Sequence, residues 1–256
     1  MGIMLSVSAN ANEAYISVSG AGVSLAITQD GDDNKVGTST DKLSVNGTSN
    51  TMYILQEGQW NQVFYIADFG SGTSWGGDIN GSSNDIKIEQ YNTTGTDVNK
   101  VGMHISGSNN DVHICQGKSF DNFSDTECSG TANEYGGHLV DLDIHASNND
   151  VKVSQQTGTG NGDHTAKIYM YGGDNNDTFI KQGGDGDKFV SLQVSTDGGA
   201  QNIIQDGSGA HTATINLGGS YYTDLDLTQD SSTDQTYTLT QDCQTAGGCT
   251  VSLTQN

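Results

Sequence analysis

The chain has 256 residues, of which 31 are acidic and 9 are Lys or Arg, so its formal net charge is −22. This charge argues against nucleic acid and anionic membrane surfaces as partners, because both require Lys and Arg to neutralise phosphate groups. Only 32% of the residues are hydrophobic, and the chain contains 35 Gly and no Pro. The regular β-branched alternation described below argues against disorder and predicts a narrow, partly polar core.

Residues 1–11 are predicted to be the remnant of a signal peptide. The stretch from Gly2 to Ser8 is apolar and small, and Ala9-Asn10-Ala11 matches the small-x-small cleavage pattern. The alternative is an apolar first β-strand, since no basic segment precedes the stretch. We expect residues 12–256 to form a single domain, and no segment is long enough to insert across a membrane.

A seven-residue phrase, Asn-x-apolar-x-apolar-x-Gln, recurs along the chain. Its Asn and Gln positions are Asn50 and Gln56, Asn84 and Gln90, Asn110 and Gln116, Asn149 and Gln155, and Asn176 and Gln182. Degenerate copies end at Gln29, Gln205, Gln229, Gln241 and Gln255. Internal repetition at a period of a few tens of residues is typical of solenoids.

The spacing of these Gln residues sets the size of a coil. Successive intervals are 27, 34, 26, 39, 27, 23 and 24 residues up to Gln229, followed by 12 and 14. We therefore predict an all-β chain, folded as a β-solenoid of irregular two-strand coils of about 23–39 residues each. The last two intervals are interpreted as half-coils, and Gly- and Asn-rich turns link the strands.

Residue parity predicts which side chains point inward. In the third copy Asn110, Val112, Ile114 and Gln116 share one face of a strand, because side chains alternate between faces. The apolar pair should face the core, so the two amides face it as well. An isolated buried amide costs about 1–3 kcal/mol, but identical amides stacked in successive coils can satisfy one another. The repeated Asn and Gln are therefore predicted to form inward ladders.

Insertions near 67–80 and 117–137 lengthen two of the coils. Cys115 and Cys128 bracket the second insertion, and Cys243 and Cys249 bracket a Gly-containing turn near the end of the chain. We expect two local disulfides as the simplest of the three connectivities, because the spacing lacks the CxxC pattern of zinc sites. Disulfides favour an extracytoplasmic location. By parity Cys115 points away from the core, where it could hold the insertion.

Other outward positions carry side chains capable of chemistry. His104 and His113 lie on consecutive strands and could meet to bind a metal ion, but we expect a solvated surface pair. Asp141 and Asp143 share an outward face without a partnering base, nucleophile or oxyanion donor. The sequence therefore predicts no enzymatic activity.

Acidic, Gly-rich stretches near residues 172–187 suggest calcium as the one candidate cofactor. Asp174 and Asp177 echo a calcium β-roll motif, and Asp185 and Asp187 follow in a second copy. The two copies are eleven residues apart, whereas the β-roll period is nine. We expect acidic corners that bind calcium at most loosely, through carboxylates and carbonyls.

The repeat resembles the curlin repeat of curli-type bacterial fibre subunits. The best matches are Gln56-x-Gly58-x-x-Asn61-x-Val63 and Gln29-x-Gly31-x-x-Asn34-x-Val36, and later copies lose the tight Gly-x-x-Asn turn. The resemblance covers most of residues 20–256. It implies secreted subunits whose stacked coils add end to end into amyloid-like fibres for adhesion and biofilm matrix. The uneven intervals and the cysteines depart from the family pattern and favour a folded block that docks head to tail.

The C-terminal strand is predicted to be an assembly edge. Val251, Leu253 and Gln255 alternate on it without a charge, whereas exposed strand edges are normally charged or covered. We expect an extracellular or cell-surface homopolymer, with the chain itself as its partner. One alternative is a phage fibre or adhesin stalk that presents its insertions to a surface receptor or glycan. A second alternative is a calcium-dependent surface-layer component.

Overall fold

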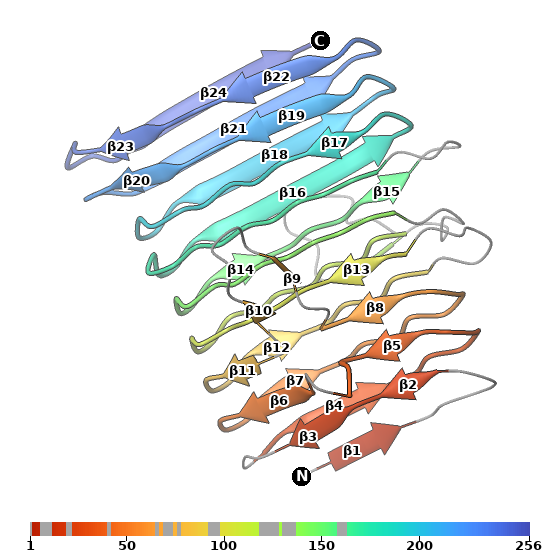
Figure 1. The fold of residues 1–256 in the computed structure, drawn as a ribbon. Helices are drawn as coiled ribbons and strands as arrows, with labels where there is room; N and C mark the ends of the chain where they lie inside the picture. Colours follow the sequence, from red (N-terminus) through yellow and green to blue (C-terminus); the bar gives the residue numbers. More distant parts are fainter. Residues whose placement is uncertain are drawn as a thin grey trace.

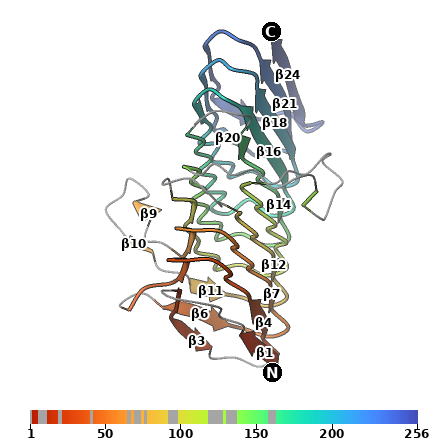
Figure 2. The same cartoon turned by 90° about the vertical axis from the view of Figure 1, so that its right-hand side faces the viewer.

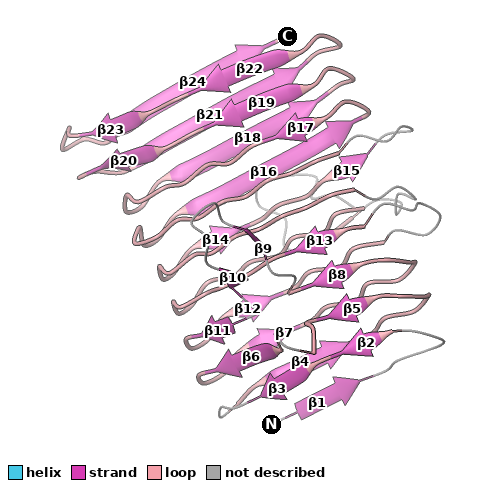
Figure 3. Cartoon of the chain, in the orientation of Figure 1, coloured by secondary structure: helices cyan, strands magenta, loops and turns pink. Residues whose placement is uncertain are grey.

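The chain winds into a parallel β-solenoid of about eight coils that rises from the N-terminal to the C-terminal end (Figure 1). The computed structural model describes residues 2–5, 12–18, 22–39, 42–64, 67–68, 74–75, 78–91, 98–117, 128–129, 137–157 and 163–256. No helix occurs among these residues, which are strands, turns and extended loops (Figure 3). The predicted all-β solenoid is confirmed.

One strand of each coil lies on the first face of the solenoid. These strands are β1 (Gly2–Leu5), β4 (Ser24–Ile27), β7 (Thr51–Met52), β12 (Asp85–Ile86), β14 (Asp150–Val151), β16 (Asp177–Gly184), β18 (Ala200–Asp206), β21 (Thr223–Asp230) and β24 (Cys249–Gln255). β15 (Gln156–Thr157) pairs with the end of β16. All pairings on this face are parallel, and bridges through Asp111 connect β12 to β14.

The return path of each coil carries up to two short strands. Its first part contains β2 (Glu13–Ala14), β5 (Lys35–Val36), β8 (Gln62–Val63), β13 (Lys100–Val101), β17 (Lys188–Phe189), β19 (His211–Thr214) and β22 (Gln235–Thr238). Its second part contains β3 (Ile16–Val18), β6 (Leu43–Asn46), β11 (Asp78–Asn80), β20 (Leu217–Gly219) and β23 (Gln241–Cys243). Figure 2 shows the two faces edge-on as a narrow stack.

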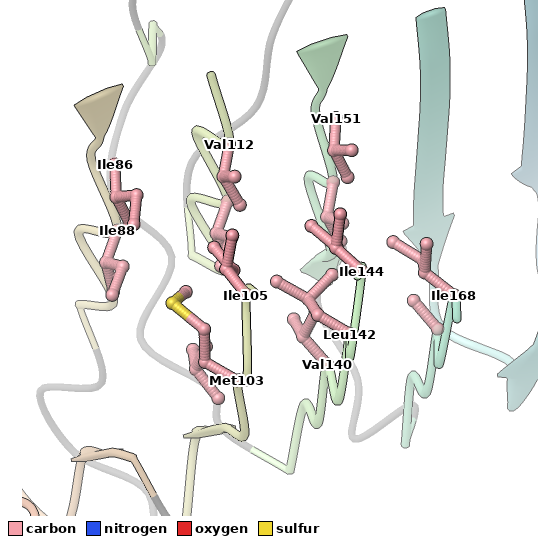
Figure 4. Packing of buried hydrophobic residues seen from close by; sticks show 14 of the residues in the cluster. Ile86, Ile88, Met103, Ile105, Val112, Val140, Leu142, Ile144, Val151 and Ile168 are labelled. Atoms are coloured by element: carbon pink, nitrogen blue, oxygen red, sulfur yellow. The ribbon is translucent and has the colours of Figure 1, made fainter. Parts of the chain in front are cut away.

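The core lies between the two faces and is one side chain deep from each. Ile86, Ile88, Val112 and Val151 come from the first face, and Met103 packs against them from the return path (Figure 4). All five are at most 1% exposed. Such a thin core follows from the low hydrophobic content, since each coil supplies only a few apolar residues.

Glycines at one corner let successive coils approach closely. A Cβ on Gly47 would lie 1.7 Å from the carbonyl oxygen of Gly81, and a Cβ on Gly81 would lie 1.8 Å from that of Gly107. Both glycines also have positive φ, of 133° and 145°. A larger residue would force these coils apart, so the turn residues here are determined by stacking rather than by local propensity.

Strand length separates the coils into two groups. In the described residues before position 157, the strands of the first face are two to four residues long, whereas β16, β18, β21 and β24 have seven or eight. All described non-glycine residues with positive φ fall between Gln29 and Ser195. The C-terminal coils are therefore regular, and the earlier ones are held in a less regular path.

Two sequence interpretations change with the register. Gln241 lies in β23 and pairs with Leu217 on the return path, so it is not a copy of the ladder position. The intervals of 12 and 14 residues therefore belong to one 26-residue coil that ends at Gln255. Gly2–Leu5 forms β1, which pairs in parallel with β4. The signal-peptide interpretation of residues 1–11 stays a prediction, and residues 6–11 lie outside the described part of the chain.

Candidate functional site: the amide ladders and the open end

A ladder of buried glutamines runs through the solenoid along the first face. The amide nitrogens of Gln56, Gln90, Gln116 and Gln155 each donate to the Oε1 of the preceding ladder residue, at 2.5 to 2.8 Å. The members from Gln29 to Gln229 are 0% exposed. Each amide thus satisfies its neighbour, which removes the desolvation penalty that a single buried Gln would carry.

The direction of this ladder reverses between Gln155 and Gln182. From Gln182 onward each amide nitrogen donates to the following coil, through Gln205 and Gln229 to Gln255, at 2.8 Å. The Oε1 atoms of both Gln155 and Gln182 have no hydrogen-bond partner within the described residues. The reversal coincides with the boundary between the irregular and the regular coils.

The repeated asparagines are also inside the molecule, at no more than 3% exposure, but they bond to backbone. The Oδ1 of Asn84 accepts the N–H of Asn110 at 2.9 Å, and its Nδ2 donates to the carbonyl of Gly107 at 2.9 Å. Asn50, Asn110, Asn149 and Asn176 occupy the same corner. The side-chain ladder predicted for Asn is therefore mainly a series of corner clamps between adjacent turns.

A second column, on the return path, was not predicted as a unit. Asn12, Asn34, Asn61 and Asn99 stack there, with Oδ1 of Asn34 accepting the N–H of Asn61 at 3.0 Å and Oδ1 of Asn61 accepting from Nδ2 of Asn99 at 2.9 Å. The Gly-x-x-Asn phrases at Asn34 and Asn61 were its signal in the sequence. No such phrase marks Asn99.

The same column continues with titratable side chains. The pairing of strands places His138, His164, Lys188 and His211 in register beyond Asn99. These four are at most 2% exposed, and the rings of His138 and His164 stack with centroids 4.9 Å apart. The ammonium group of Lys188 donates to the carbonyls of Gly186, Gly207 and Gly209 at 2.8 to 3.1 Å.

Burial sets the protonation of this column. Desolvation, together with His164, holds the pKa of His138 well below its usual value. Desolvation and the nearby Lys188 lower the pKa of His164 to about 3, and desolvation also lowers the pKa of His211. The pKa of Lys188 is lowered by desolvation against the opposing carboxylates of Asp206, Asp187 and Asp185. The histidines are therefore neutral near pH 7.

The C-terminal end of the described stack exposes a cross-section of the core. Val251, Leu253 and Gln255 in β24 are half-buried, whereas Leu225 and Leu227 one coil below are at most 2% exposed. Tyr237 and Leu239 of the last return path are also partly buried against the core. β24 pairs with β21 on one side, and in the described chain its other edge has no strand partner.

Both disulfides form as predicted. Cys115 bonds Cys128, with Cα atoms 6.1 Å apart, and Cys243 bonds Cys249, with Cα atoms 5.8 Å apart. Cys115 points away from the main core, as parity indicated, but it is fully buried in a small cluster with Phe179. The second disulfide closes the corner immediately before β24. The last turn is further held by the Tyr222 hydroxyl, which donates to the carbonyl of Gly247 at 2.7 Å.

The calcium candidates are not brought together. Asp174 and Asp177 lie at the start of β16, and Asp185 and Asp187 follow its end. Eight strand residues separate the two pairs, which is roughly 25 Å of extended chain. The Oδ1 of Asp174 accepts the N–H of Ser147 at 2.7 Å, and that of Asp187 accepts the N–H of Asp163 at 3.3 Å. In the structure these carboxylates bind the backbone of neighbouring coils.

The expected solvated histidine pair is wrong. His104 and His113 are 5% and 4% exposed, and each lies beside different acidic groups. His113 is 3.4 Å from carboxylate oxygens of Asp111 and Asp150, whereas His104 approaches Asp143. Asp141 and Asp143 do lie on the outward face of their strand, but both are buried at 2% exposure. Parity identified the face correctly and could not reveal that it is covered.

Comparison with family models, with curated proteins and with solved structures gave no match to this chain. In the portion that the structure describes, no helix combines the length and the apolar character needed to cross a membrane.

Proposed function

We propose that this chain is a structural subunit that adds end to end to copies of itself, forming an extracellular fibre of the adhesion or biofilm-matrix type. The observation that supports this most directly is the open C-terminal cross-section. Val251 and Leu253 occupy core positions yet remain half-exposed, and another coil stacked in register would cover them. A second copy, approaching with its first coil, offers the same parallel strand chemistry.

Head-to-tail stacking of this kind produces an open filament rather than a closed ring. The docking surfaces at the two ends differ, so each added copy leaves a fresh end for the next. The parallel, in-register pairing between coils provides the geometry, with neighbouring strands about 4.8 Å apart. Stacked amides would continue from Gln255 into the next molecule.

The disulfides favour docking of a folded block. Cys243–Cys249 fixes the corner that leads into β24, so the edge is ordered before a partner arrives. Both disulfides also require an oxidising compartment during folding, which supports the secreted location that we propose. The net charge of −22 would keep free subunits apart, and cations or acid would relax that repulsion.

Electron microscopy of the purified full chain tests the proposal. Negative staining at increasing protein concentration should show long unbranched fibres for the wild type. The double variant V251K/L253K places two ammonium groups on the exposed cross-section and should abolish fibres while leaving monomers folded. The matched control S252K/T254K adds the same charge to outward positions of the same strand and should still assemble. Stable wild-type monomers at all concentrations would overturn the proposal.

A second candidate function rests on the first insertion. β9 (Ala67–Asp68) and β10 (Ser74–Trp75) form an antiparallel pair, which projects from the side of the solenoid in Figure 2. A stalk that presents this hairpin to a surface receptor or glycan would need no assembly edge. Deletion of residues 67–75 separates the two functions, because it should abolish binding to a target surface and leave fibre formation intact.

A further inference from the structure

Three potential metal ligands converge on the outward face of two adjacent return paths. The Oδ1 of Asp143 lies 2.8 Å from Nε2 of His145 and 3.9 Å from Nε2 of His104. One ligand atom from each of the three residues lies within 4.8 Å of the other two. Among the described residues this is the one such group of three metal-ligating side chains.

The register of the coils explains why these residues meet. Lys100 pairs with Leu139, so residues 39 apart in the sequence lie above one another. Asp143 therefore stacks directly on His104, and His145 stacks two positions further along the same face. Each ligand alternates with core residues such as Leu142 and Ile144, which hold the strands in place. The site consequently joins two successive coils.

The spacing suits a small transition-metal ion. Zinc binds nitrogen and oxygen ligands at about 2.0 Å, which places neighbouring ligands of a tetrahedron roughly 3.3 Å apart. The observed separations of 2.8 and 3.9 Å bracket that value, so modest side-chain rotations would complete the arrangement. Two imidazoles and one carboxylate favour zinc, copper or nickel over calcium and magnesium, which prefer oxygen ligands.

The surroundings also resemble the outer shell of a metal site. The Tyr171 hydroxyl hydrogen-bonds to the Asp143 carboxyl, and the Tyr171 ring stacks on that of His145 with centroids 5.7 Å apart. Burial raises the pKa of Asp143, so this carboxylate gains from a cation beside it. Asp143 and His104 are buried, whereas the side chain of His145 is 35% exposed. A metal could therefore enter from the His145 side and keep a water ligand there.

We propose that His104, Asp143 and His145 form a binding site for one zinc-like divalent transition-metal ion, which fastens two adjacent coils together. The Nε2 atoms of both histidines and a carboxylate oxygen of Asp143 supply three ligands, and solvent supplies the fourth. The ion would displace the present hydrogen bond between His145 and Asp143. This site does not depend on the assembly edge and would exist in a monomer as well as in a fibre.

Zinc titration of the full chain provides the test. The protein is stripped with chelator, and binding is measured by calorimetry and by elemental analysis in excess calcium, which saturates loose carboxylate sites. We expect one zinc per chain and an affinity that falls below about pH 6, because the imidazoles must be neutral to bind. Cobalt(II) should give visible absorption bands of a four-coordinate site.

Substitutions then assign the ligands. H145N, at the more exposed position, and H104N should each lower the affinity by tenfold or more, and Y171F should lower it by a smaller factor. The matched control is H113N, since His113 is equally buried on a neighbouring strand but lies outside the group. The proposal is overturned if the wild type takes up no zinc at millimolar concentration. It is equally overturned if H145N, verified as folded by circular dichroism, binds zinc as the wild type does.

Discussion

The coils before residue 157 and those after residue 177 use the same glutamine ladder on very different backbones. The earlier coils have first-face strands of two to four residues, whereas the later strands run for seven or eight. The ladder hydrogen bonds are nevertheless equally short in both groups, at 2.5 to 2.8 Å. Side-chain stacking is thus the constant feature, and backbone pairing is the variable one.

Coil length accounts for the difference. Ladder members after Gln182 are 23, 24 and 26 residues apart, so corresponding residues stay in register along the whole strand. In the earlier coils the separations are 27, 34, 26 and 39, and the extra residues must leave and rejoin the stack. The Gln ladder and the Asn corner clamps are what keep these uneven coils aligned.

The largest difference between the two regions is expected from the ladder itself. Gln116→Leu leaves two neighbouring amides unsatisfied and should lower the free energy of unfolding by roughly 2–6 kcal/mol. Gln205→Leu should cost less, because long strands on both sides hold that coil. Urea denaturation measures both, and Gln62→Leu on an outward position serves as the control. Equal losses for Gln116 and Gln205 would contradict the comparison.

The two disulfides give the next largest contrast. Replacing Cys115 and Cys128 by Ser opens a longer loop and should cost about 3 kcal/mol, against about 2 kcal/mol for Cys243 and Cys249. The first loss should appear in global unfolding. The second should appear mainly as faster hydrogen exchange in β24, since that strand has a single neighbour. Faster exchange throughout the solenoid in the second variant would show that the end coil is not a separate unit.

Acid should weaken the later coils through the buried histidines. His138 and His164 stay neutral in the fold because their pKa values are depressed, whereas unfolded histidines take up protons near pH 6.5. The unfolded chain binds more protons below that pH, so stability falls as the pH falls, by up to about 1.4 kcal/mol per histidine per pH unit. For His164 this loss continues down to its pKa of about 3.

The variant H138N/H164N isolates this effect, because Asn is the residue of the same column in the earlier coils. Its stability should depend less steeply on pH than that of the wild type between about pH 6 and pH 4. The raised pKa values of Asp111 and Asp177 act in the opposite direction but are common to both proteins. Parallel pH profiles would mean that the column does not govern acid sensitivity.

The smallest effect is expected at the surface of the earlier coils. Lys35 and Glu13 approach to 3.7 Å, with side chains 41% and 45% exposed. Lys35→Ala should change the free energy of unfolding by no more than about 0.5 kcal/mol, because solvent screens such pairs. A thermal melt within one or two degrees of the wild type would agree. A large loss would mean that outward charges contribute to coil stacking.

The sequence sufficed to predict features that depend on local pattern. Alternation placed Val112 and Gln116 on one inward face, and short spacing paired Cys243 with Cys249. Features that depend on the offset between coils could not be predicted. His104 meets Asp143 because that offset is 39 residues, and its value follows from the length of an insertion rather than from the repeat. The stacking of His138 on His164 has the same origin.

The reversed Gln ladder has a consequence for growth. A row of stacked amides behaves as a chain of aligned dipoles, and its two halves here point away from each other, from Gln155 and Gln182 toward the ends. The nitrogen of Gln255 therefore faces outward at one end, and that of Gln29 is turned away from Gln56 at the other. Two copies meeting head to tail would oppose donor with donor. Rotation of the amides from Gln182 to Gln255 would supply an acceptor at the joint and also remove the internal mismatch, so filament growth and repair of this defect would be a single event.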